Sequence, residues 1–334
     1  MVAISIIKES NTKALPSALP SGLVAVFLGG TSGIGQATLK QFVIATKDKS
    51  PRVYIVGRST EAARPLLAEL RQSNPSATLE FIQQDVSLVR NVDAAVSQIT
   101  QHENKVDLLY MSTGFVSFQG RKETTEGLEP SMTTRYYSRA RAIQLLLPLL
   151  NRSENAHVIN ILAAGQEAPL LEDDLDLKKP GNFSIGSSSQ HATTMLTLLL
   201  EKWAAENPNI SFVHQFPGLV ATPLLTRGSG GITGFLLRWI ISPFINTFVA
   251  ASPEDAGARS LFHATNARHT VPARANRAAP IPEGLEIAGQ SAGGVFQLSE
   301  KSDYVNNEKV LVDQRRLTET VWEHTQQIYA RVTQ

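Results

Sequence analysis

The sequence has 334 residues, of which 42% are hydrophobic and 18% charged, and its formal net charge is +1. This composition is ordinary for a globular protein with a large buried core. It offers no basic run for nucleic acid and no cysteine for disulfides, thiol catalysis or thiolate metal sites. The seven histidines lack metal-ligand spacing. No apolar run is long enough to span a membrane, and the N-terminus lacks a secretory signal, so we expect a cytoplasmic protein without a metal.

Residues 1–20 contain Pro16 and Pro20, and we expect an extended arm there. Beyond it, strand and helix patterns alternate without a clear linker, so we expect residues 21–334 to form one domain with a C-terminal extension from about 266. The predicted strands are 23–28, 52–56, 78–84, 106–111, 156–162, 210–216 and 293–298. The predicted helices are 36–46, 61–72, 88–101, 132–150, 188–205, 253–263 and 312–332. This alternation predicts an α/β fold, a doubly wound parallel sheet (Rossmann fold) in three layers.

The stretch from Gly22 to Gly35 predicts a nucleotide-binding turn. A continuous apolar run is followed by three spaced glycines and then by helix-like apolar spacing. Residues without a Cβ let backbone N–H groups approach a diphosphate at the positive end of the helix. The expected cofactor contacts are Gly29, Thr31, Ser32, Gly33, Ile34 and Gly35. A purely structural turn is the alternative.

The end of the second predicted strand bears on the choice of cofactor. Gly57-Arg58-Ser59 follows it, with no carboxylate before Glu61. An arginine complements a ribose 2′-phosphate, whereas a carboxylate would bind the 2′-hydroxyl. Arg58 and Ser59 therefore favour NADP(H) over NAD(H), the alternative being a solvated arginine.

Two motifs resemble those of the short-chain dehydrogenase/reductase superfamily. Gly29 to Gly35 is similar to its T-G-x-x-x-G-x-G turn, with Leu28 replacing the threonine, and 216–223 is similar to its P-G-x-V-x-T segment. The resemblance covers roughly residues 22–265. It implies that the nicotinamide is contacted by Pro217, Gly218, Val220 and Thr222, and that Gly114 forms a turn beside the ribose. It also implies that Asp85 and Val86 lie at the adenine, although Asp85 would serve equally as a helix N-cap.

The catalytic half departs from this family. Its reductases use a Tyr-x-x-x-Lys pair, whose lysine lowers the tyrosine pKa, together with a serine and an asparagine. Aligning 189–197 with the family's S-K-A-A run puts Gln190 at the lysine and Gly186 at the tyrosine. Ala163 then replaces the serine and Arg135 the asparagine, and no tyrosine occurs between Tyr137 and Tyr304. We therefore predict that the standard proton relay is absent.

Four polar residues are candidates to replace that relay. Arg135 is a fixed cation, Ser187 and Gln190 would share a helix face, and His191 is the nearby group that titrates around neutrality. For each of them a structural role, as helix cap, packed histidine or surface side chain, is the alternative.

Residues 223–251 are predicted to form an apolar lid inserted after the sixth strand. Residues 235–250 are the most apolar stretch, interrupted by Arg238 and Pro243. An oligomer surface or a membrane-surface helix is the alternative. The resemblance also allows a homodimer or homotetramer.

The pattern as a whole looks like divergent members of that superfamily from fungal secondary metabolism. It implies an NADP(H)-dependent oxidoreductase that reduces a ketone or imine, or oxidises an alcohol, on a bulky apolar small molecule. A non-redox cyclase, isomerase or pericyclase on the same scaffold is the second hypothesis. A catalytically inactive nucleotide-binding protein is the third.

Overall fold

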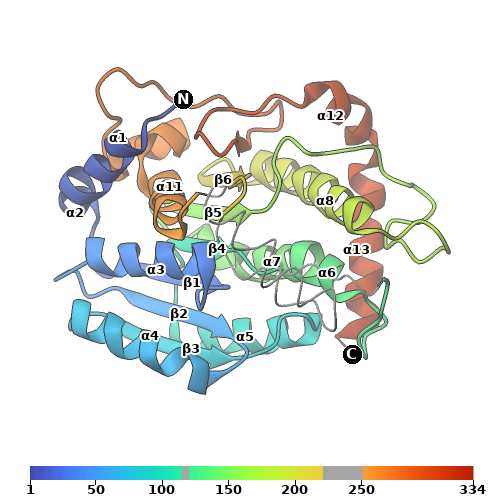
Figure 1. The fold of residues 1–334 in the computed structure, drawn as a ribbon, viewed down its shortest axis with the longest axis horizontal. Helices are drawn as coiled ribbons and strands as arrows, with labels where there is room; N and C mark the ends of the chain where they lie inside the picture. The colour runs from blue at the N-terminus through green and yellow to red at the C-terminus, as the bar shows by residue number, and fades with distance from the viewer. Residues whose placement is uncertain (115–119, 221–250, 334) are drawn as a thin grey trace, which may run out of the picture.

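The computed structural model of the chain describes residues 1–114, 120–220 and 251–333, and these residues are organised around a seven-stranded parallel sheet (Figure 1). The strand order is β3-β2-β1-β4-β5-β6-β7. The strands are β1 Val24–Leu28, β2 Arg52–Gly57, β3 Thr78–Gln83, β4 Leu108–Met111, β5 Ala156–Ile161, β6 Ile210–Gln215 and β7 Phe296–Leu298. All six strand pairings are parallel. The predicted doubly wound α/β sheet is confirmed.

Helices cover both faces of the sheet, because successive side chains of a strand point to opposite sides. Val24 and Val26 of β1 belong to one apolar core, and Ala25 and Phe27 belong to the other. The first core includes residues of α5 Val89–His102, α7 Ser138–Leu150, α8 Ile185–Glu206 and α13 Thr318–Val332. The second includes residues of α3 Gly33–Ala45, α4 Thr60–Ser73 and α11 Pro253–Thr265. The result is the three-layer arrangement that the sequence predicts.

The helix predicted over 132–150 is longer and less regular than expected. It begins as α6 Pro130–Met132, widens into the π-helical turn η2 Thr133–Tyr137 and continues as α7. Glu129 caps its start, since its carboxylate accepts the N–H of Met132 at 2.8 Å. Such wide turns shift the side chains around the helix axis and are frequent at functional sites.

The expectation of an extended N-terminal arm is wrong, because residues 4–18 are helical. They form α1 Ile4–Glu9, the π-turn η1 Ser10–Ala14 and α2 Leu15–Ala18. Ile7 packs with Phe262 of α11, and the Asn11 amide donates to the Ala258 carbonyl at 2.8 Å. Figure 1 shows α1 beside α11 at the edge of the molecule. Burial against α11 therefore decides the conformation of this segment, which the prolines alone did not reveal.

The remaining elements follow α11 in the chain. They are η4 Ala267–His269, η5 Pro272–Arg277, α12 Glu308–Gln314, η6 Arg315–Leu317 and then α13. The predicted apolar lid, 223–251, lies outside the described residues except for Ala251. Among the helices that the structure describes, none combines the length and apolarity needed to cross a bilayer.

Candidate functional site

Two neighbouring cavities open at the carboxyl ends of the strands, around β1 and β4, where the strand order reverses. Ligands of open α/β sheets bind at this kind of switch point. The outer cavity is lined by Gly29, Thr31, Ser32, Val56, Gly57, Arg58, Gln84, Asp85, Val86, Ser87, Ser112, Thr113, Gly114, Pro130 and Thr134. The inner cavity is lined by Ser32, Gly33, Ile34, Gly35, Ser112, Thr113, Gly114, Arg135, Arg139, Ile161, Leu162, Ala163, Ser189, Phe216, Pro217 and Gly218. The glycine turn and the end of β4 are common to both.

The glycine turn is closed tightly against the end of β4. A Cβ on Gly35 would lie 2.2 Å from the Gly29 carbonyl oxygen and 2.5 Å from the Ser112 hydroxyl. Gly29 itself has a φ of +98°, which residues with side chains rarely adopt. Because the turn and the end of β4 meet here, there is no room for a Cβ at Gly35. Gly33, Ile34 and Gly35, the first residues of α3, line the inner cavity.

At the outer cavity, Arg58 is exposed at the end of β2, and it has no carboxylate within 4.0 Å among the described residues. Asp85 lines the same cavity and accepts the N–H of Ser87 at 3.0 Å. Ser59 does not line the cavity, since its hydroxyl caps α4 by accepting the Ala62 N–H at 3.2 Å. Asp85 does not cap α5 either, because the Glu126 carboxylate accepts the N–H of Val89 at 2.7 Å.

The inner cavity contains two arginines four residues apart, Arg135 in η2 and Arg139 in α7. Their exposed fractions are 8% and 1%. Arg139 donates from Nη2 to the Thr113 carbonyl at 2.6 Å and from Nε to the Thr134 carbonyl at 3.2 Å. Burial, and then the charge of Arg135, lower the Arg139 pKa to about 9. Burial also lowers the pKa of Arg135. Arg139 was not among the residues that the sequence suggested.

The predicted residues on α8 do not line the inner cavity. Ser187 forms a capping box with Ser184 and donates to the Asn182 carbonyl at 2.7 Å. Gln190 is exposed. His191 is buried against the preceding loop, where its Nε2 accepts the Leu171 N–H at 3.2 Å, and burial lowers its pKa. The helix instead turns Ser189 toward the cavity, opposite Ala163 at the end of β5.

Behind Ala163 lies a buried polar chain that the sequence did not reveal. The Ala163 N–H donates to His214 Nε2 at 3.4 Å, and His214 Nδ1 lies 2.9 Å from the Thr197 hydroxyl. That hydroxyl donates to Glu167 at 2.9 Å. Because the Thr197 hydroxyl uses its hydrogen for Glu167, its oxygen accepts from the Nδ1–H of His214. The proton of His214 is therefore on Nδ1, and its Nε2 is the acceptor for the Ala163 N–H. This series of hydrogen bonds holds the backbone at Ala163, which lines the inner cavity.

The segment after β6 reaches the inner cavity through Pro217 and Gly218. Val220 follows and forms a parallel bridge with Ala251. Thr222, the predicted contact for the nicotinamide carboxamide, lies outside the described residues.

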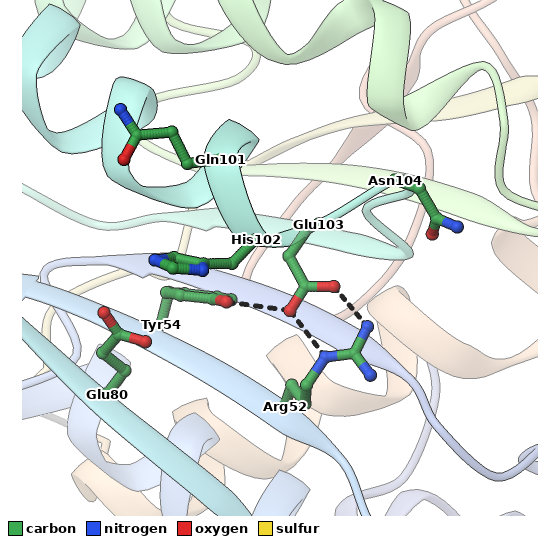
Figure 2. Close-up of a pocket in the computed structure, with 7 residues that line it drawn as sticks. All are labelled: Arg52, Tyr54, Glu80, Gln101, His102, Glu103 and Asn104. Carbon is green, nitrogen blue, oxygen red and sulfur yellow. Dashed lines mark hydrogen bonds and ion pairs between the residues drawn. The ribbon is translucent and has the colours of Figure 1, made fainter.

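A third concave surface lies at the opposite, amino-terminal edge of the sheet (Figure 2). There the buried Glu103 carboxylate accepts from Arg52 Nε at 2.6 Å and from the Tyr54 hydroxyl at 2.8 Å. A second guanidinium nitrogen of Arg52 also donates to it. Figure 2 shows these three side chains turned toward one another. All of these bonds to the Glu103 carboxylate come from the protein, so the ion pair has a structural role. The cleft also lies at the amino ends of the strands, whereas cofactors of such sheets bind at the carboxyl ends.

Comparison with known proteins identifies the family. A profile of the family described as "short chain dehydrogenase" matches residues 23–229, more than half of the chain. The NmrA-like family domain-containing oxidoreductase notO of Aspergillus sp. is 43% identical, over 99% of this chain and 96% of that protein. Oxidoreductase AN1596 of Emericella nidulans is 38% identical, over 98% of each chain.

A solved structure supports the same fold. The Pseudomonas aeruginosa RhlG/NADP active-site complex matches with a TM-score of 0.55 and 21% identity, over 80% of this chain and 98% of that one. This likeness concerns the arrangement of strands and helices alone. With the profile and the two relatives, it leads to one conclusion: the chain belongs to the short-chain dehydrogenase/reductase family.

Proposed function

We propose that this chain is an NADP(H)-dependent oxidoreductase that acts on a bulky, largely apolar small molecule in secondary-metabolite biosynthesis. The observation that carries the proposal is the pairing of a Cβ-free glycine turn with Arg58, which has no carboxylate partner among the described residues, at the rim of the same cavity. The similar proteins from Aspergillus and Emericella are named oxidoreductases, and the Pseudomonas neighbour is an NADP complex.

The residues present fit such a cofactor. Gly29 and Gly35 let the turn close against the end of β4, so that a diphosphate would lie at the N-terminus of α3, and the end of β2 offers Arg58 to a 2′-phosphate. Asp85 and Val86 would border the adenine, and Gly114, Pro217 and Gly218 the nicotinamide half. The cofactor would supply or accept the hydride.

The chain's own contribution to chemistry would come from Arg135 and Ser189. Arg135 places a fixed positive charge in the inner cavity, where it would hold a substrate oxygen that carries negative charge. The Ser189 hydroxyl would donate to the oxygen at the reacting carbon, and in this role Ser189 takes the place of Ser187, which the sequence had suggested. Among the described residues that line this cavity, none titrates near neutral pH. An imine, or a carbonyl whose alkoxide takes its proton from water after hydride addition, fits a site of this kind.

The lining of the inner cavity supports a second candidate, a non-redox cyclase or isomerase. Such an enzyme needs substrate folding and electrostatic stabilisation, which apolar walls and Arg135 provide without an acid–base pair. The nucleotide cavity would then be a structural remnant.

Calorimetric titration with NADPH, NADP⁺ and NADH separates the two candidates. Micromolar affinity for NADPH, with NADH at least about tenfold weaker, is expected for the oxidoreductase. A hydride-transfer screen of apolar ketones and imines with NADPH would follow. If none of the three nucleotides binds, the oxidoreductase proposal fails and the non-redox candidate takes its place.

A further inference from the structure

The inner cavity holds two arginines for which the described residues supply no counter-ion. Neither Arg135 nor Arg139 has a carboxylate within 4.0 Å among the described residues, whereas elsewhere in the molecule the buried carboxylates of Glu103, Glu126 and Glu201 each lie against an arginine. Glu129, the acid whose charge acts on Arg135, is already used to cap α6 and to accept from Ser131. The missing partner is therefore not found in the described protein.

The undescribed stretches do not offer an acidic side chain either. Residues 115–119 read Phe-Val-Ser-Phe-Gln, and residues 221–250 contain Arg227 and Arg238 but no aspartate or glutamate. Whatever neutralises the two arginines is thus not a side-chain carboxylate from these stretches.

The two arginines differ in what they are free to do. Arg139 is held by the Thr113 and Thr134 carbonyls, and its Nη1 is buried without a hydrogen-bond partner. Arg135 lines the cavity and makes no hydrogen bond to any described residue. A desolvated guanidinium is costly unless it is paired, and its planar donor fork matches an oxyanion. In the wide turn η2 the aliphatic stem of Arg135 lies beside Gly114, because a Cβ built on that glycine would be 3.9 Å from Arg135 Cγ.

We propose that Arg135, with Arg139 behind it, binds an anionic oxygen group of the substrate, and that the substrate is accordingly an apolar molecule bearing a carboxylate. The apolar part would lie on Ile161, Leu162 and Phe216, which line the same cavity. This refines the substrate of the proposed function and rests on it for the assignment of the cavity as the reaction site. It changes the expected substrate from a largely apolar molecule to an amphiphilic one.

An oxyanion could also come from the cofactor, because Gly33 and Gly35 line the inner cavity as well. The diphosphate and a substrate carboxylate would present the same chemistry to Arg135. The experiment must therefore measure the two ligands separately.

The test uses two probes of equal shape and different charge, 4-phenylbutyrate and 4-phenylbutyramide. Each is titrated calorimetrically into the full chain at low salt, with and without saturating NADP⁺. We expect the carboxylate to bind about tenfold or more tightly than the amide. Arg135→Gln should reduce this preference to within about twofold and leave the Kd of NADP⁺ unchanged, and Arg135→Lys should restore part of it.

Arg316→Gln is the matched control, since Arg316 is an exposed arginine paired with Glu172 outside the cavity. It should change neither the preference for the carboxylate probe nor the Kd of NADP⁺. A cooperative thermal unfolding transition shows that each variant is folded. Equal binding of the two probes, no binding of either, or an unchanged preference in Arg135→Gln would overturn the proposal. Loss of NADP⁺ affinity in Arg135→Gln with the preference intact would assign the arginine to the diphosphate. If the wild type binds no NADP⁺, the proposed function fails, while the preference measured without cofactor still decides this inference.

Discussion

The outer and inner cavities lie side by side, but backbone groups shape the first and side chains give the second its chemistry. The outer cavity and the glycine turn owe their shape to the backbone, because glycine conformations and strand ends place the N–H groups. The inner cavity owes its chemistry to side chains that helices η2, α7 and α8 turn inward, Arg135, Arg139 and Ser189. Backbone geometry follows from local sequence, whereas the direction of a helical side chain depends on a register that one wide turn shifts. This difference explains why the sequence pointed to the glycine turn that lines both cavities but not to Arg139 or Ser189.

The largest effect of a substitution on ligand binding is expected at the glycine turn. Gly35→Ala would bring a Cβ to 2.2 Å from the Gly29 carbonyl oxygen, so the turn must open. We expect NADPH affinity to fall by more than about 100-fold and the free energy of unfolding by roughly 2 kcal/mol. Calorimetry and urea unfolding measure the two quantities.

Gly186→Ala is its matched control. Gly186 lies in the first turns of α8, and a Cβ there would approach no atom closer than the Ser184 hydroxyl at 3.8 Å. Nearly unchanged affinity in both variants would show that the turn does not bind nucleotide.

Acid is expected to destabilise the protein through its buried histidines. Burial lowers the pKa of His157 to about 4 and the pKa of His214 and His263 to about 3. Below an ordinary pKa near 6.5 the unfolded chain binds protons that the native state excludes, so stability is complete above pH 6.5 and is lost as the pH falls toward 4. Summed over these three histidines, the loss is on the order of 8 kcal/mol by pH 4.5.

Urea unfolding between pH 8 and pH 4.5 gives this profile. His263→Asn should make the loss shallower by about one proton, whereas a substitution of the exposed His102, such as His102→Gln, should not. A free energy of unfolding that stays level from pH 7 to pH 5 would contradict the prediction.

The amino-terminal edge of the sheet should affect stability without affecting ligand binding. Glu103→Ala leaves Arg52 and Tyr54 without their shared acceptor, at a cost of roughly 2–3 kcal/mol. NADPH affinity should stay within about twofold, since the cleft lies at the far end of the strands. Glu80→Ala, in the same cleft but without a hydrogen-bond partner among the described residues, should cost less than about 0.5 kcal/mol. A large fall in NADPH affinity for Glu103→Ala would show that the two edges are coupled.

The smallest effect distinguishes the two cofactors. Arg58→Ala removes the charge at the end of β2 and should weaken NADPH about tenfold while leaving NADH within about twofold. Arg64→Ala, on the exposed side of α4, should change neither. Equal losses for both cofactors would exclude a contact with the 2′-phosphate.

The sequence alone was enough to predict the strands, the three layers and the glycine turn, whereas the strand order comes from the structure. Continuous apolar runs and the space that a missing Cβ leaves are local properties, so Val24 to Gly35 could be understood without any distant residue. It did not determine the helical conformation of residues 4–18, which depends on burial of Ile7 against α11.

Only the tertiary structure decided what faces the inner cavity. The π-turn at Thr133–Tyr137 exposes Arg135 to the cavity, the Thr113 and Thr134 carbonyls hold Arg139, and the capping box removes Ser187 while presenting Ser189. Each of these outcomes depends on contacts between segments far apart in the chain, and a residue-by-residue alignment does not contain them.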